Sequence, residues 1–258
     1  TGSGKTTTLY AFLRKIYSPE IKIITIEDPI EYHLIGITQT QTNDKKGYTF
    51  LEGLRSALRQ DPDVIMVGEI RDKETAETAV QSSLTGHMVF STLHTNNAAG
   101  VIPRLIDLGV NPKILVSALS LSIAQRLVRK LCQFCKEENA PTEGEMKTIK
   151  LVLDGMKEEG KDFSKYNINS DISFKIFSAV GCEKCNKIGY SGRIGIFEAI
   201  RNDAEIEKII PENPSEREIK KVAHNQGILS MRQDGVVKIL NGVTSITEVQ
   251  SVVDLLEE

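Results

Sequence analysis

The chain opens on a glycine-rich turn followed by a lysine and two threonines. Glycines let consecutive backbone N–H groups surround phosphate oxygens, a lysine neutralises the β- and γ-phosphates, and a threonine hydroxyl reaches Mg²⁺. The turn leads into an apolar helical pattern over 6–16, whose positive end would face the anion. A turn without function is the alternative, and the helix that follows disfavours it. The residues predicted to bind nucleotide are Gly2, Ser3, Gly4, Lys5, Thr6 and Thr7, with Thr6 also holding Mg²⁺.

The same motif predicts what should precede the chain. The full P-loop pattern contains one more glycine, whose position falls before residue 1, and a strand should lead into the loop. We therefore expect this sequence to be a fragment that begins inside its own nucleotide site.

Composition narrows the class of protein. The chain has 258 residues and a net charge of -3, with both signs mixed along it, so no basic face indicates nucleic acid. No uncharged run approaches the roughly 20 residues of a bilayer span, and no signal peptide is visible. Two C-x-x-C pairs favour a reduced compartment and a metal site over a disulfide scaffold. These features predict a cytosolic α/β protein.

The first two-fifths of the chain alternates apolar runs with helical patterns. Strands are predicted over 21–26, 64–67 and 88–92, and helices over 6–16, 51–59 and 74–84. Such alternation indicates a parallel sheet with crossover helices. Ligands of these sheets bind outside the carboxyl ends of the strands.

Chemically reactive residues follow each predicted strand. The segments are Glu-Asp-Pro-Ile-Glu at 27–31, Gly-Glu-Ile-Arg-Asp at 68–72 and Ser-Thr-Leu-His-Thr at 91–95. All three should therefore lie at one edge of one sheet, together with the P-loop. Attack of water on a γ-phosphate needs a metal ion, a carboxylate and cationic groups, and these residue types are the ones that recur there.

We assign one catalytic role to each segment. Glu69 is predicted to be the acid on the Mg²⁺ side, although Gly68 stands where many P-loop ATPases have an aspartate. Glu31 is predicted to activate water, and His94 to sense the γ-phosphate. The alternatives are a solvated turn for the acids of 27–31 and a core histidine for His94.

Five segments resemble the secretion ATPase superfamily, specifically the type II secretion and type IV pilus assembly motors (the GspE and PilB group). IITIEDPIEY at 23–32 resembles its Asp box, LRQDPDVIMVGEIRD at 58–72 the region of its Walker B acid, and TGHMVFSTLHTNNA at 85–98 its His box. SIAQRLVRKLCQFC at 122–135 and YSGRIGIFEAI at 190–200 resemble its zinc-containing branch.

The resemblance implies a RecA-like hexameric ATPase that uses ATP and Mg²⁺ to assemble pilins or pseudopilins. It would act at the cytoplasmic face of the inner membrane, beside a membrane platform protein. Lys5 and Thr6 match the phosphate and Mg²⁺ ligands, Glu31 the catalytic carboxylate, Glu69 the Walker B acid and His94 the His-box histidine. Domains that precede this region in the family, with arginines that reach a neighbouring site, would be missing. The isolated fragment is therefore expected to be inactive.

Four arginines also match positions in the family. Arg193 is assigned to nucleotide binding, and Arg55, Arg59 and Arg71 to phosphate or subunit contacts. Surface salt bridges are the alternative for all four.

The cysteines form two pairs, and a set of four thiolates favours a closed tetrahedral Zn²⁺ site. A redox pair and free thiols are the alternatives. The charged segment 136–165 between the pairs is predicted to be a solvated excursion with one helix near 145–156. The predicted zinc ligands are Cys132, Cys135, Cys182 and Cys185.

Helical patterns follow residue 202, at 204–209, 215–225, 230–241 and 246–255. We predict a C-terminal helical subdomain from them. The expected parts are a RecA-like core over 1–130, a tetracysteine zinc insert over 131–190 and the helical subdomain over 191–258.

Other functions stay open at this point. They are a DNA-uptake or conjugation ATPase of the same superfamily, a RecA-like helicase, a PilT-like retraction ATPase, and a zinc-stabilised module that binds nucleotide without turnover. The four cysteines favour an assembly motor over a retraction motor, which usually lacks them.

Overall fold

The computed structural model describes residues 2–168 and 174–256. Contacts divide the chain into two compact units. The sheet unit consists of Gly4–Ser122 and Arg201–Ala223, and the cysteine unit consists of Thr1–Ser3, Ile123–Ile200 and His224–Glu258.

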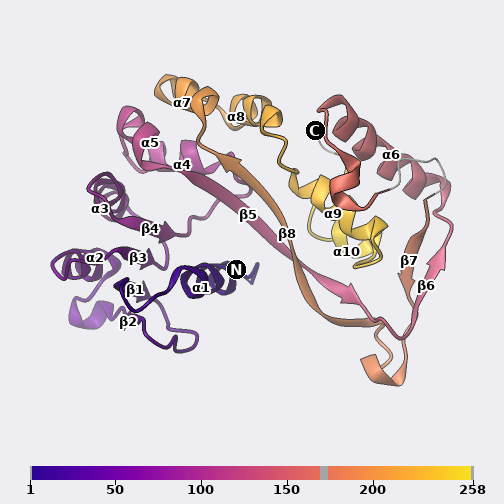
Figure 1. Ribbon diagram of the computed structural model, residues 1–258, viewed down its shortest axis with the longest axis horizontal. Helices are drawn as coiled ribbons and strands as arrows, with labels where there is room; N and C mark the ends of the chain where they lie inside the picture. The colour runs from indigo at the N-terminus through magenta and orange to yellow at the C-terminus, as the bar shows by residue number, and fades with distance from the viewer. Residues whose placement is uncertain (1, 169–173, 257–258) are drawn as a thin grey trace. The chain divides into compact units, whose positions relative to one another are not determined.

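A four-stranded sheet forms the centre of the sheet unit, in the order β2-β1-β3-β4 (Figure 1). All its neighbouring strands pair in parallel, as the alternating pattern predicted. Every residue of β1 and β3 is buried, so these two strands are the apolar centre of the sheet. The strands are β1 (Ile23–Glu27), β2 (Thr38–Gln41), β3 (Val64–Val67) and β4 (Met88–Ser91).

The edge strand β2 was not predicted from the sequence. Its four residues read Thr-Gln-Thr-Gln and lack an apolar face, and its two end residues are exposed. Backbone pairing holds it in place, with Ile24 opposite Thr38 and Glu27 opposite Gln41. A polar edge strand of this kind has no hydrophobic periodicity to reveal it.

Three helices follow the predicted pattern closely: α1 (Lys5–Ile16), α2 (Phe50–Leu58) and α3 (Lys73–Leu84). The side chain of Thr49 caps α2 by accepting the Glu52 N–H, and that of Asp72 caps α3 by accepting the Thr75 N–H at 2.9 Å. The buried side of α1 packs Tyr10 and Leu13 into a core with the strand residues Ile23, Val64 and Met66 and with Leu34 of the loop before β2.

The chain leaves the sheet unit after residue 122 and returns to it at residue 201. The outgoing helices are α4 (Val101–Asp107) and α5 (Pro112–Ala118), and the returning helices are α7 (Ala204–Ile209) and α8 (Glu216–Ala223). Asn202, in the returning segment, is hydrogen-bonded to the outgoing segment. Its side-chain amide donates to the Val116 carbonyl at 2.6 Å, and its backbone N–H donates to the Ser120 carbonyl at 3.0 Å.

The cysteine unit contains two two-stranded sheets and three helices (Figure 1). The strands β5 (Leu121–Leu131) and β8 (Tyr190–Arg201) form one sheet, and β6 (Lys136–Asn139) pairs antiparallel with β7 (Ile176–Ala179) in the other. The helices are α6 (Glu143–Glu158), α9 (Met231–Leu240) and α10 (Ile246–Gln250).

The charged segment between the cysteine pairs is not simply a solvated excursion, so that prediction needs correction. Its helix α6 places Ile149, Val152 and Met156 in a core with Val236 and Ile239 of α9. The charged residues of α6 occupy its other side. The helix is therefore amphipathic, although its segment is rich in charged residues.

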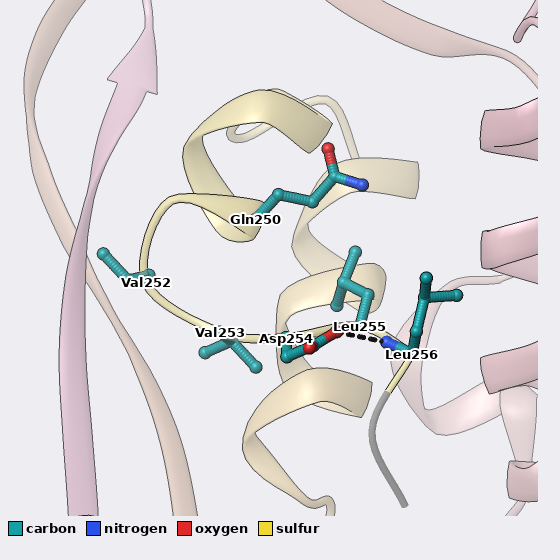
Figure 2. A pocket seen from close by; sticks show the side chains of 6 residues that line it. All are labelled: Gln250, Val252, Val253, Asp254, Leu255 and Leu256. Atoms are coloured by element: carbon teal, nitrogen blue, oxygen red, sulfur yellow. Dashed lines mark hydrogen bonds between the residues drawn. The ribbon is translucent and has the colours of Figure 1, made fainter.

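The last predicted helix is shorter than expected. It ends at Gln250, and Figure 2 shows the chain beyond it turning through Val252 and Val253. Asp254 then accepts the Leu256 N–H at 2.8 Å, and Leu255 is only 1 % exposed. Of the four predicted C-terminal helices, two belong to each unit. None of the helices in the described part of the chain is long and apolar enough to cross a membrane.

Candidate active site

The loop that leaves the carboxyl end of β3 is bonded to the end of strand β1 and to the loop that leaves β4. The Gly68 N–H donates to the Ile26 carbonyl at 2.8 Å, and the Ile70 N–H donates to the Thr92 carbonyl at 3.0 Å. The Thr92 hydroxyl in turn donates to the Gly68 carbonyl at 2.8 Å. These bonds hold two of the predicted segments, 68–72 and 91–95, together at one edge of the sheet.

Glu69 lies at the centre of this edge. Its carboxylate accepts a hydrogen bond from the Arg71 guanidinium on one oxygen, and Nε2 of His94 lies 2.9 Å from the other oxygen. The Glu69 side chain is 15 % exposed, whereas those of Arg71 and His94 are 59 % and 64 % exposed. The sheet therefore brings together three predicted site residues from two separate loops.

The charge of Glu69 is stabilised by this arrangement. The hydrogen bond from Arg71 lowers the pKa of Glu69, burial opposes that shift, and His94 adds to the lowering. The pKa of Arg71 is raised in turn by its bond to Glu69. Glu69 is thus an anion at neutral pH, with a cation on one side and a histidine on the other.

The start of α1 is built to receive an anion. Gly4 precedes the helix in the left-handed conformation, with φ of 86°, and no side chain caps the first turn. The first N–H groups of a helix lack intrahelical partners and carry the positive end of its dipole. In Figure 1 the β4 arrow points toward the side on which α1 begins. Lys5 and Thr6 are the first two residues of this helix.

The acidic segment after β1 divides into two environments. Asp28 and Glu31 are exposed in the loop. Glu27 instead ends β1 and is 2 % exposed, so it is not part of a solvated turn. Thr25 and Glu27 lie two residues apart and share a face of the strand, so the Thr25 hydroxyl reaches the Glu27 carboxylate.

The other predicted arginines are not bonded to Glu69 in the contacts that the structure describes. Arg55 on α2 forms an exposed ion pair with Glu52 at 3.0 Å, which is the surface salt bridge of the alternative interpretation. Arg59 follows α2 and donates to the Ser56 hydroxyl at 3.1 Å. Arg193 is exposed on β8 of the cysteine unit.

The four cysteines of the cysteine unit form one cluster, and their sulfur atoms all lie within 4.8 Å of one another. The Sγ–Sγ distance is 3.9 Å between Cys132 and Cys182, 3.8 Å between Cys135 and Cys185, and 3.8 Å between Cys182 and Cys185. Sulfurs bound tetrahedrally to one zinc ion at ~2.3 Å lie about 3.8 Å apart. The thiols are free of disulfide bonds, and their spacing fits a single Zn²⁺.

Backbone N–H groups around the cluster favour thiolates. Cys135 accepts from the Gly181 N–H at 3.3 Å, and Cys185 accepts from Cys182 at 3.2 Å and from Gly189 at 3.3 Å. The backbone bond from Cys182 is the main cause that lowers the pKa of Cys185 to about 6, whereas burial raises the pKa of Cys135 to about 12. Thiolate is the form that binds metal.

A surface pocket in the cysteine unit, lined by residues 250–256, does not share this chemistry (Figure 2). Its lining is mostly aliphatic, and its one acid already accepts the Leu256 N–H. Among the residues that the structure describes, the sheet edge and the cysteine cluster carry the candidate site chemistry.

The parallel sheet, with helices between its strands and an acid–histidine pair at its carboxyl edge, defines an α/β protein. The chain belongs to the Type II/IV secretion system protein family, which matches residues 1–251.

Named relatives support this membership. The chain is 48 % identical over 249 residues to a type II secretion system protein E of Pseudomonas aeruginosa, covering 96 % of this chain and 46 % of the relative. It is 44 % identical over 252 residues to the type IV pilus assembly ATPase PilB of the same organism, covering 98 % and 42 %. The chain thus spans less than half the length of these relatives.

Solved structures agree on the fold. The pilus retraction motor PilT with bound ADP matches with a TM-score of 0.64 and 28 % identity, over 98 % of this chain and 58 % of that one. The Legionella pneumophila ATPase DotB matches with a TM-score of 0.62 and 24 % identity, over 98 % and 57 %.

Proposed function

We propose that this chain is the nucleotide-hydrolysing part of a motor ATPase for type II secretion or type IV pilus assembly. The observation that carries the proposal is the Glu69 carboxylate, held between Arg71 and His94 at the carboxyl edge of the parallel sheet. Family membership and the names of the relatives agree with it. ATP is the proposed substrate, and ADP and phosphate are the products.

The roles of the residues follow from charge and position. The N–H groups at the start of α1 and the Lys5 ammonium bind the phosphates, while the Thr6 hydroxyl and Glu69 are the residues to hold Mg²⁺. A bound Mg²⁺ supplies charge neutralisation on the phosphates. Glu31 accepts a proton from the attacking water, and His94 senses the γ-phosphate across its bond to Glu69.

The arginines and the helices are assigned to assembly. We place Arg193 at the nucleotide, and Arg55, Arg59 and Arg71 at phosphate or subunit contacts of a homohexamer. The core over 1–130, the insert over 131–190 and the helices over 191–258 would then bind nucleotide, hold the zinc ion and pack between subunits. An inner-membrane platform protein, at the cytoplasmic face of that membrane, is the proposed partner.

The cysteine cluster is proposed to be a structural zinc site. Four ligands complete a tetrahedron and leave no open position for substrate, which is typical of structural rather than catalytic zinc. The N–H groups of Gly181 and Gly189 support the thiolates from outside the coordination sphere.

The test compares two variants of the intact protein, meaning the natural polypeptide that contains this chain. Glu31→Gln should bind ATP normally but hydrolyse it at least about 100-fold more slowly, because an amide cannot accept the proton of water. Lys5→Ala should weaken ATP binding itself. The measurements are steady-state phosphate release and the Kd for ATP.

Glu52→Gln, which changes an exposed acid of α2, is the matched control and should keep parental turnover. Parental turnover in Glu31→Gln would show that Glu31 is not the base, and Glu69 would become the candidate. An intact protein that binds ATP and releases no phosphate would contradict the proposed activity.

A further inference from the structure

A buried polar network joins α1 to the end of β1. Tyr10 is fully buried on α1, and its hydroxyl donates to one oxygen of Glu27. The other Glu27 oxygen accepts from the Thr25 hydroxyl at 2.5 Å and from the Gln39 amide of β2 at 3.0 Å. A buried carboxylate is costly unless hydrogen bonds satisfy it, so these partners fix one arrangement of the four side chains.

The network also contacts the loop that carries Glu31. The Gln39 amide nitrogen donates to the Tyr32 carbonyl at 3.2 Å and lies 3.3 Å from the Tyr10 hydroxyl. The rings of Tyr10 and Tyr32 meet edge to face, with centroids 4.7 Å apart. The neighbouring Ile30 N–H reaches the side chain of Gln41 at 3.4 Å. The residues on both sides of Glu31 are therefore held by groups from α1 and β2.

The Tyr10 hydroxyl stays protonated and so remains a hydrogen-bond donor to Glu27. Burial, together with the hydrogen bond and charge of Glu27, raises its pKa, so the hydroxyl keeps its proton and stays a donor. The Glu31 backbone N–H approaches the same hydroxyl and opposes that shift. Tyr10 thus faces Glu27 and the backbone of Glu31 at once.

We propose that Tyr10 and Glu27 are positioning residues that fix the backbone of Glu31 relative to the phosphate-binding start of α1. Both side chains are buried. Tyr10 lies five residues after Lys5 on the same helix, and Glu27 lies four residues before Glu31. The network links the group that holds the phosphates to the group that activates water. A misplacement of ~1 Å between such groups costs about 100-fold in rate. This inference rests on the proposed ATPase function.

The test removes single hydrogen bonds in the intact protein. Tyr10→Phe deletes only the hydroxyl, and Gln39→Leu removes the amide contacts to Glu27 and Tyr32 while keeping Tyr10 and Glu27. Each should lower kcat for ATP about tenfold and leave KM and the Kd for ADP within about twofold of parental values, because phosphate binding is untouched. Backbone amides over 28–32 should exchange with solvent faster in both variants.

Tyr48→Phe is the matched control. It also deletes one partly buried hydroxyl, which donates to Thr40 at 3.0 Å, but this bond does not involve the Glu31 loop. The control should leave kcat and the exchange of 28–32 at parental values. A purely structural role would instead lower the unfolding temperature of Tyr10→Phe and of the control alike, with kcat unchanged.

Parental kcat and parental exchange over 28–32 in Tyr10→Phe and Gln39→Leu would overturn the proposal. If Tyr10→Phe does not fold, Gln39→Leu decides by the same two readouts. If the parental protein binds ADP but hydrolyses no ATP, the ATPase proposal fails, and the exchange over 28–32 still decides whether the network holds the loop.

Discussion

At the scale of single residues, the charge of Glu69 depends on its neighbours. Arg71 and His94 come from different loops, and both act to keep the carboxylate ionised. A carboxyl whose pKa is lowered by folding contributes stability above its unfolded pKa, and that contribution is lost as pH falls through the lowered value.

We therefore predict a pH-dependent effect for Glu69→Gln. At pH 7 the variant should have a lower free energy of unfolding than the parental chain. The difference should begin to shrink as pH falls below the ordinary value of 4.5 and should vanish once pH is below the lowered pKa. The difference should stay under about 1 kcal/mol, because Arg71 and His94 are largely exposed. Urea unfolding across this pH range measures it.

Glu52→Gln is again the control, since it removes an acid from an exposed pair on α2. A Glu69→Gln effect that grows toward acid pH would contradict the assignment of a lowered pKa.

At the scale of elements, α6 shows how a helix within a charged segment is specified. Thr142 accepts the Glu145 N–H, and the Glu145 carboxylate accepts the Thr142 N–H at 2.8 Å, which makes a complete capping box. Its apolar side then joins the core of the cysteine unit.

Thr142→Ala should lower the free energy of unfolding of the cysteine unit by about 1 kcal/mol, because the first turn of α6 loses its capping oxygen. Thr142→Ser keeps the hydroxyl and should stay within about 0.5 kcal/mol of the parental value. Hydrogen exchange of the α6 amides measures both. Equal protection in Thr142→Ala and the parental chain would show that core packing alone sets the start of the helix.

The cysteine cluster operates at the same scale, because it joins the ends of β5, β6, β7 and β8. Metal-binding energy at such a site is folding energy. We expect one zinc ion per chain by elemental analysis, and Cys182→Ser should lower both the zinc content and the unfolding temperature. Phe134→Ala, an exposed change between Cys132 and Cys135, should keep the metal.

Turnover of nucleotide should not depend directly on the zinc ion if the site is structural. Purified protein with no zinc, or with a disulfide in either cysteine pair, would contradict the zinc proposal.

At the scale of the whole molecule, assembly is expected to set activity. An arginine supplied by a neighbouring subunit increases turnover about 10³–10⁵-fold in other P-loop systems. The resemblance places such arginines in a domain outside these 258 residues. The chain spans 46 % of its type II secretion relative, so comparison with the intact protein is informative.

We predict that the 258-residue chain alone is mainly monomeric and nearly inactive. The intact protein should form hexamers, and its turnover per subunit should rise with protein concentration. Light scattering and phosphate release on both proteins test this. Equal turnover per chain would show that the site is complete within this chain and would remove the physical basis of a ring motor.

Local chemistry made much of this molecule predictable. Apolar runs located β1, β3 and β4, and helical patterns in the sequence located α1, α2 and α3. The parallel-sheet rule correctly placed Glu69, Arg71 and His94 at one edge, because the carboxyl ends of parallel strands meet there. Two C-x-x-C pairs correctly indicated one cluster.

Long-range contacts decided the rest. The strand β2 exists because its polar backbone pairs with β1, and α6 is buried because α9 packs against it. The return of residues 201–223 to the sheet unit depends on partners such as Val116, about 85 residues away along the chain. Glu27 is the sharpest case. By itself the sequence determined that an acid follows the first strand, but only the tertiary structure, which supplied Tyr10 and Gln39 as donors, decided that this acid would be buried.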